Sequence, residues 1–225
     1  MQIKQLKFYT PIAMLFVCLL LIVNIISQKI IPIYGNIILT AGDFIYPLSY
    51  TLSMILTEVY GYTMSRRVIW SSFACSILAS IIIIFAINLP YADSWHNQEQ
   101  YASILGSTPR ILMASLGAFL FGEFIGTYTL AKLKIATHGK YLWMRTLGAI
   151  SIGQLLDSLI FTTIAFVGVV SLRHVIILSL AAYVCKIIYQ VLLTPGIYVL
   201  VGFLKKHEGL DVFDRRTDFN PFNLK

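Results

Sequence analysis

Charged residues are scarce in this sequence. They make up 12% of its 225 residues, whereas hydrophobic residues make up 58%. A soluble domain has about 25% charged and about 45–50% apolar residues, so this composition indicates a protein of the lipid bilayer. The net charge of +7 would suggest a nucleic-acid partner in a soluble protein. Here the basic residues lie almost wholly in loops and tails, so no nucleic-acid partner is expected.

Motifs of the common enzymes are also lacking. The sequence contains no H-E-x-x-H, no G-x-S-x-G and no Walker lysine loop. Its three cysteines lie in apolar segments without metal-ligand spacing, and its four histidines lie in loops or tails. We therefore predict no catalytic residue, no metal, no cofactor and no enzymatic activity. An enzyme acting within the membrane stays open as the minority alternative.

Long apolar runs dominate the chain. Crossing a bilayer takes about 20 apolar residues, and the sequence offers six such runs: 9–28, 37–58, 67–89, 110–131, 143–168 and 174–204. We predict an all-α polytopic membrane protein with six transmembrane helices in one bundle over residues 1–206, followed by a polar cytoplasmic tail over 207–225. Gly42, Asp43 and Pro47 interrupt the second run, so its helix is expected to be broken or kinked.

Basic residues are distributed unequally between the two sides of this predicted bundle. Most of the 17 Lys and Arg residues fall on one side, in 1–8, 59–67, 132–145 and 205–225, whereas Lys29 and Arg173 fall on the other. Positively charged loops stay in the cytoplasm, so both termini are expected there. In the outward loop 89–109, Trp95 is interpreted as an interfacial anchor rather than part of a lid.

Two ionisable residues lie deep inside apolar runs. Asp157 is in the fifth run and Lys186 is in the sixth. A charge in hydrocarbon costs at least about 2.5–3.5 kcal/mol unless it is paired or faces water. The two runs are antiparallel neighbours, so a salt bridge is allowed. Gln154 shares a helix face with Asp157, and Gln190 shares one with Lys186, which favours a lined polar pocket. The alternative is a buried pair that only fixes helix register.

A membrane bundle most often uses such a polar layer for transport. Further residues at membrane depth complete the candidate substrate-binding set. Alongside Asp157, Lys186, Gln154 and Gln190, this set contains Asn24, Asp43, Glu58, Glu123, Phe44 and Tyr50. Acidic groups can accept hydrogen bonds from a heterocycle, and the rings of Phe44, Tyr46, Tyr50 and Tyr60 can stack on it. Ordinary alternatives remain open, because Glu58 can simply pair with nearby arginines and aromatic residues also serve packing.

The run AGDFIYPLSYTLSMILTEVYGYTMSRRVIW resembles the signature of the bacterial vitamin uptake transporter family. The similarity rests on these matching residues: Gly42, Phe44, Pro47, Leu48, Tyr50, Glu58, Val59, Tyr60, Gly61, Arg66, Arg67 and Ile69. It continues through Arg110, Asp157, Lys186 and Pro195. Characterised members import queuosine precursors. The resemblance therefore implies a multi-pass transporter of the bacterial inner membrane that takes up 7-cyano- or 7-aminomethyl-7-deazaguanine.

Acidic residues depart from the family pattern at four positions. Met54 stands where the family usually has Asp, and Asp43 stands where it has a small or hydroxyl residue. In the fourth run, Glu123 and Gly126 stand where the family has Gln and Asp. The alternative function is therefore a substrate-binding subunit, or a carrier, for another vitamin-like or purine-like heterocycle. The expected partners are a small-molecule substrate and the bilayer. A homodimer is left open, and an ATPase partner is not favoured because the first apolar run lacks a small-residue stripe for docking.

Overall fold

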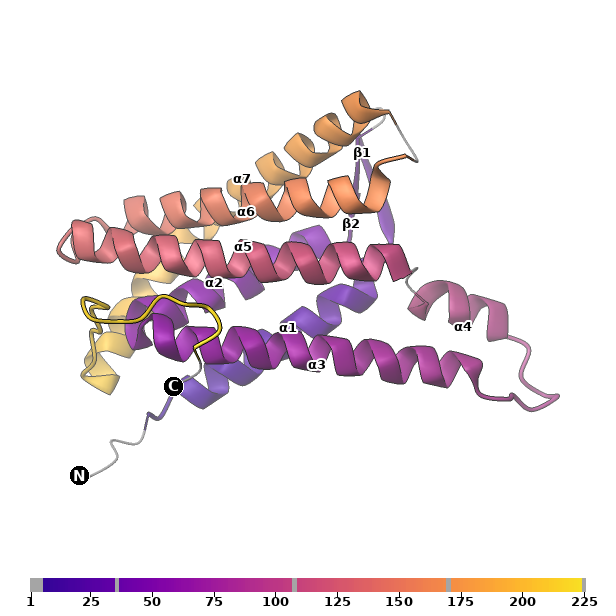
Figure 1. Ribbon diagram of the computed structural model, residues 1–225, viewed down its shortest axis with the longest axis horizontal. Coiled ribbons are helices and arrows are strands. Elements are labelled where there is room, and N and C mark those ends of the chain that lie inside the picture. The colour runs from indigo at the N-terminus through magenta and orange to yellow at the C-terminus, as the bar shows by residue number, and fades with distance from the viewer. Residues whose placement is uncertain (1–5, 35–36, 107–108, 169–170, 224–225) are drawn as a thin grey trace.

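The chain folds into a bundle of long helices, seen in a computed structural model that describes residues 6–34, 37–106, 109–168 and 171–223 (Figure 1). In order, its elements are α1 (Tyr9–Ile26), β1 (Ile30–Tyr34), β2 (Ile37–Thr40), α2 (Gly42–Tyr60), α3 (Tyr62–Asn88), α4 (Gln98–Leu105), α5 (Pro109–Ala136), α6 (Leu142–Phe166) and α7 (Leu172–Glu208). The predicted all-α membrane class is confirmed, with one small hairpin added.

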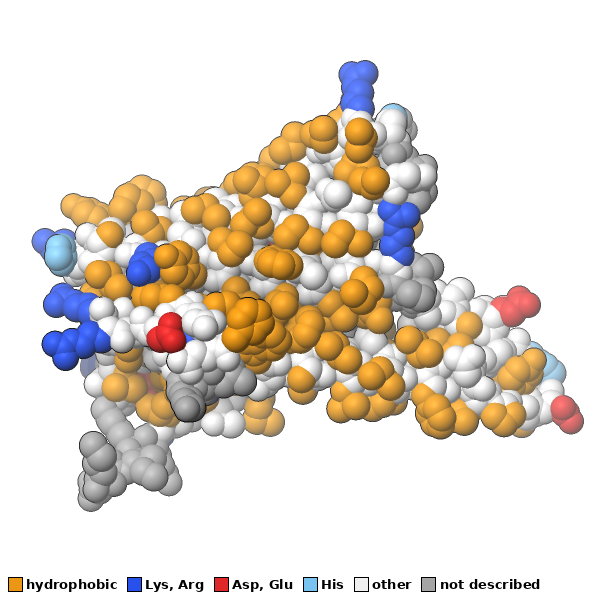
Figure 2. Space-filling model, viewed as in Figure 1, with side chains coloured by type: hydrophobic (Ala, Val, Ile, Leu, Met, Phe, Trp, Pro, Cys, Tyr) orange, Lys and Arg blue, Asp and Glu red, His pale blue; other side chains and the backbone are white. Residues whose placement is uncertain are grey.

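Five candidate spans are long and apolar enough to cross a membrane. They lie at Tyr9–Ile26, Tyr62–Asn88, Gln98–Ala136, Leu142–Phe166 and Leu172–Glu208. Figure 2 shows hydrophobic side chains over much of one face of the bundle, with most of the visible Lys and Arg at one end. The remaining predicted span, the second run at 37–58, corresponds largely to α2, which is not among the five, so the count of six stays a prediction.

Helix α2 lies at the centre of the bundle. It contacts α1, α3, α5, α6 and α7, and every residue from 49 to 60 is buried. Buried hydroxyls must find partners, and two of them donate to carbonyls one turn earlier in α2: Thr51 to Pro47 at 2.8 Å and Thr57 to Ser53 at 3.0 Å. Neighbouring helices thus replace lipid around α2, so its hydroxyl groups are satisfied inside the protein.

The second span begins differently from its predicted bounds. Residues 37–40 form strand β2, which pairs antiparallel with β1 so that Ile30 lies opposite Thr40. The helix starts only at Gly42 and continues through Pro47 to Tyr60. The interruption therefore lies before the helix, because the β-branched residues on both sides of the turn favour a hairpin.

Helices α5 and α6 pack closely at glycines. A Cβ built on Gly122 would lie 3.1 Å from the Gly153 carbonyl, and one built on Gly153 would overlap the Tyr50 hydroxyl. That hydroxyl donates to the Gly122 carbonyl at 2.8 Å. Small residues let membrane helices approach in this way, and here they also admit a tyrosine from α2.

The C-terminal tail folds back over one end of the bundle. The Arg66 guanidinium donates to the carbonyls of Asp218 and Asn220 at 2.9 and 2.6 Å, and the Trp70 indole donates to Pro221 at 2.7 Å. The backbone N–H of Phe8 donates to Glu208 at 2.7 Å, so the start of α1 and the end of α7 meet at this end. The predicted boundary between residues 206 and 207 falls inside α7, which ends at Glu208.

Candidate functional site

A buried salt bridge joins α6 to α7. Lys186 Nζ lies 2.8 Å from Asp157 Oδ2 and 3.8 Å from Asp43 Oδ1. Tyr46 of α2 donates its hydroxyl to the other Asp157 oxygen at 3.1 Å, and its ring centroid lies 4.8 Å from Lys186 Nζ. Asp43 is itself oriented by Thr40, whose N–H and hydroxyl donate to Oδ2 at 2.8 and 2.9 Å. Side chains of α2 and α6 thus surround the lysine of α7, and the hairpin orients one of them.

This ion pair lies in the wall of a cavity of about 390 Å³. Four predicted site residues line it: Asn24, Asp43, Asp157 and Lys186. Ligand pockets typically measure about 300–1,000 Å³, so the volume suits a small molecule. The cavity is surrounded by the late turns of α1, α3 and α6 and the early turns of α2, α5 and α7. It therefore lies in the half of the bundle opposite the end where α1 begins and α7 finishes.

Sequence reasoning missed several residues of the cavity wall. Ser76, Ser158, Phe119 and Phe161 all line it, together with Tyr46, which the sequence suggested only as a stacking ring. Among the described residues, the buried hydroxyls of Ser76 and Ser158 have no hydrogen-bond partner. A buried polar group without a partner is uncommon and calls for an explanation such as a ligand. Ser158 follows Asp157 directly, which was the one local signal that could have revealed it.

Five other predicted site residues do not line the cavity. Gln190 exchanges hydrogen bonds with Thr51 at 3.0 and 3.1 Å. Gln154 is buried, and neither polar atom of its amide has a partner in the described part of the chain. Tyr50 is held between glycines, as described above, whereas Phe44 is 41% exposed. Glu123 accepts a hydrogen bond from Ser53 at 2.6 Å.

The remaining predicted residue, Glu58, lies in a cationic cluster at the end covered by the tail. Arg145 donates to both of its oxygens, at 3.1 and 2.7 Å, and Lys205 lies 2.6 Å away. Lys134 lies 3.6 Å from Glu58 and 2.6 Å from Asp211. Burial raises the pKa of Asp211, but hydrogen bonds from Lys134 and Lys205 outweigh burial and lower that pKa below its ordinary value. Because these cations compensate its charge, Glu58 links α2 to α5, α6 and α7, and Lys134 extends the network to Asp211 of the tail.

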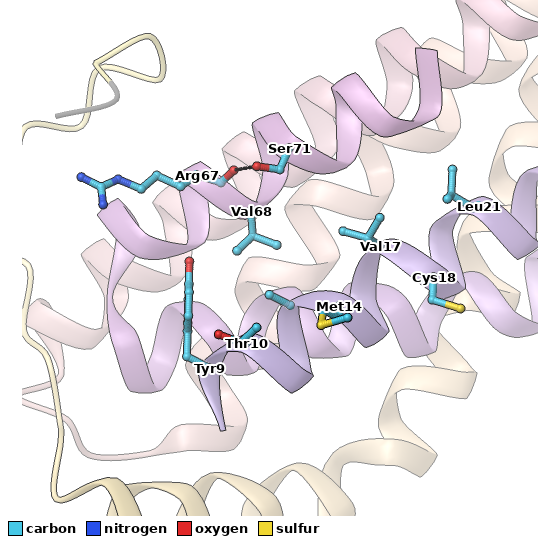
Figure 3. Close-up of a pocket in the computed structure, with 10 residues that line it drawn as sticks. Tyr9, Thr10, Met14, Val17, Cys18, Leu21, Arg67, Val68 and Ser71 are labelled. Carbon is cyan, nitrogen blue, oxygen red and sulfur yellow. Dashed lines mark hydrogen bonds between the residues drawn. The ribbon is translucent and has the colours of Figure 1, made fainter. Parts of the chain in front are cut away.

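A second hollow, of about 520 Å³, lies between α1 and α3 (Figure 3). Its wall is mostly apolar and includes Met14, Val17 and Leu21. Figure 3 shows the Arg67 side chain extending away from it. The hollow contains none of the predicted site residues, and it offers a polar ligand few groups to bind. The cavity beside Lys186 is therefore the better candidate site.

Most of the chain matches a family of known proteins. A sequence model of the family described as "Putative vitamin uptake transporter" matches residues 40–200, which include α2 and the helices that carry Asp157 and Lys186. The chain belongs to this family. It is thus a multi-pass membrane protein of a transporter family.

Two curated relatives are similar over most of their length. The "Probable queuosine precursor transporter" of Bacillus subtilis is 25% identical over 186 residues, covering 82% of this chain and 81% of the relative. The "Queuosine precursor transporter" of Escherichia coli is 23% identical over 171 residues, covering 74% and 75%. No solved structure matches the chain.

Proposed function

We propose that this protein imports a queuosine precursor, 7-cyano- or 7-aminomethyl-7-deazaguanine, across the bacterial inner membrane without altering it chemically. The observation that carries the proposal is the position of Lys186, Asp157 and Asp43 in the wall of a small-molecule-sized cavity. The pair is buried, yet both of its side chains border this cavity instead of contacting only other side chains. The names of the two bacterial relatives support the choice of substrate.

The chemistry of the cavity wall suits a deazaguanine. Such a base presents a flat aromatic face, an edge of N–H donors and a carbonyl acceptor. Asp43 and Asp157 supply acceptors for the donor edge, while Lys186 and the Ser158 hydroxyl supply donors for the carbonyl. Phe119 and Phe161 supply apolar rings next to these groups.

The orientation in the membrane follows from the distribution of charge. Lys134, Arg145 and Lys205 lie at the end where the termini meet, and positively charged ends stay in the cytoplasm. We infer that both termini are cytoplasmic and that the cavity occupies the outer half of the bundle. Substrate then enters from outside, while the Glu58 cluster and the tail close the cytoplasmic end.

The test uses a bacterial host that neither makes the base nor has its own transporter. Expression of this chain should restore queuosine in the host's tRNA when a low concentration of 7-cyano-7-deazaguanine is supplied outside. Unmodified tRNA despite protein in the membrane would refute the assignment. Another vitamin-like or purine-like heterocycle would then be the leading candidate.

A further inference from the structure

Glu123 of α5 is a buried carboxyl group that the proposed binding cavity does not use. Its side chain has no exposed surface. Ser53 of α2 donates a hydrogen bond to Oε2 at 2.6 Å, whereas Oε1 has no hydrogen-bond partner among the described residues. Glu123 directly follows Gly122, one of the two glycines at which α5 and α6 approach. It therefore sits at the junction of three helices, between the outer cavity and the cytoplasmic cluster.

The charge around Glu123 distinguishes it from the other buried carboxylates. The buried lysine pairs with Asp157 and Asp43, and the cytoplasmic cations pair with Glu58 and Asp211. The titratable groups that interact with Glu123 are Tyr46 and Tyr50 of α2 and Asp157 of α6, none of which is cationic. Among the described residues, no ion pair therefore compensates a negative charge here.

Such a site favours a carboxyl group that carries a proton while the site is closed. An unpaired charge inside a membrane costs several kcal/mol, and this cost disappears when the carboxylate binds a proton. Ser53 can serve both forms, because a hydroxyl group donates to either kind of carboxyl oxygen. Opening of the α2–α5 contact to water would remove the penalty and allow the proton to leave.

We propose that Glu123 is a proton-binding site that couples substrate uptake to proton entry. It takes up a proton from the outer cavity, holds it while the site is closed, and releases it to the cytoplasm when the α2–α5 contact opens. Substrate and proton move in the same direction. The proposal rests on the transport function proposed above, and it supplies that function with an energy source.

The first test measures accumulation of 7-cyano-7-deazaguanine in membrane vesicles with an imposed pH gradient. For one proton per substrate, a gradient of one pH unit supports up to about tenfold accumulation, because one unit is a tenfold ratio of protons. Wild-type protein should accumulate substrate, and a protonophore should abolish the accumulation. Glu123→Gln keeps an acceptor for Ser53, so it should still exchange substrate across the membrane but lose accumulation entirely. Glu99→Gln, at an exposed glutamate of α4, is the matched control and should behave as wild type.

Two results in vesicles would overturn the coupling. One is wild-type accumulation that is insensitive to the protonophore, and the other is protonophore-sensitive accumulation by Glu123→Gln.

A second measurement needs no substrate: infrared spectroscopy of the purified protein at different pH. A protonated-carboxyl band that is lost on raising the pH and absent from Glu123→Gln supports the site. Absence of such a band, or a band that never titrates, overturns it even if wild type proves to transport nothing.

Discussion

Neutralising Asp157 and Lys186, singly and then together, shows whether the pair binds substrate or only stabilises the fold. Removing one partner of a buried ion pair costs about 3–5 kcal/mol because a charge is stranded. Lys186→Met leaves Asp157 and Asp43 without their shared cation, so the stability lost by this variant should fall in this range. Asp157→Asn should cost less, because Asp43 remains 3.8 Å from the lysine. The double variant leaves only Asp43 without its cation, and Asp43 is partly exposed and keeps two hydrogen bonds from Thr40, so this variant should recover most of the stability.

The test measures thermal unfolding in detergent and substrate uptake for wild type, the two single variants and the double variant. A side chain that donates or accepts a charged hydrogen bond to substrate contributes about 1.5–3 kcal/mol, or roughly 10- to 150-fold in affinity. The binding-site account therefore predicts that the double variant melts close to wild type but takes up almost no substrate. Wild-type uptake by a well-expressed double variant would refute it and make the pair purely structural.

Three further predictions test packing, topology and the tail. Gly153→Ala should destabilise the protein by about 1–3 kcal/mol because its methyl group would overlap a tyrosine hydroxyl, whereas Gly148→Ala, where the methyl meets ordinary contacts, should not lower the melting temperature in detergent. A membrane-impermeant thiol reagent added to intact cells should label Trp95→Cys but not Lys140→Cys, and the reverse pattern would invert the topology. The lowered pKa of Asp211 means that its contribution is complete at neutral pH and is lost as the pH falls below about 4; Asp211→Asn should cost less than about 1 kcal/mol at pH 7 and flatten that acid dependence of melting, and an unchanged acid profile would contradict it.

Much of the helical framework could be predicted from the sequence, because hydropathy determines which segments lie in a bilayer. The meeting of Asp157 with Lys186 could also be anticipated, since antiparallel neighbours at 1.5 Å per residue place the two at similar depth. Both inferences depend on properties that are local in sequence.

Features that depend on distant segments were not predictable in the same way. The central position of α2 depends on five other helices, and its polar residues gave only an ambiguous signal. Tyr46 was expected only as a stacking ring, because only the fold brings its hydroxyl to Asp157. Gln190 and Glu58 have the chemistry of site residues, but Gln190 is hydrogen-bonded to Thr51 and Glu58 is paired with a cationic cluster. The covering of one end by the tail depends on carbonyl contacts that no side-chain pattern reveals.

Equilibrium binding of 7-cyano-7-deazaguanine to the purified protein tests the central claim most directly, because it needs no assumption about energy coupling. Bound ligand also raises the stability of the folded state, so a concentration-dependent increase in melting temperature provides a second readout. We predict saturable binding by wild type and its loss in the Asp157→Asn/Lys186→Met variant, provided that this variant melts like wild type. Absence of binding by folded wild-type protein, or equal binding by the double variant, would contradict the assignment of the cavity.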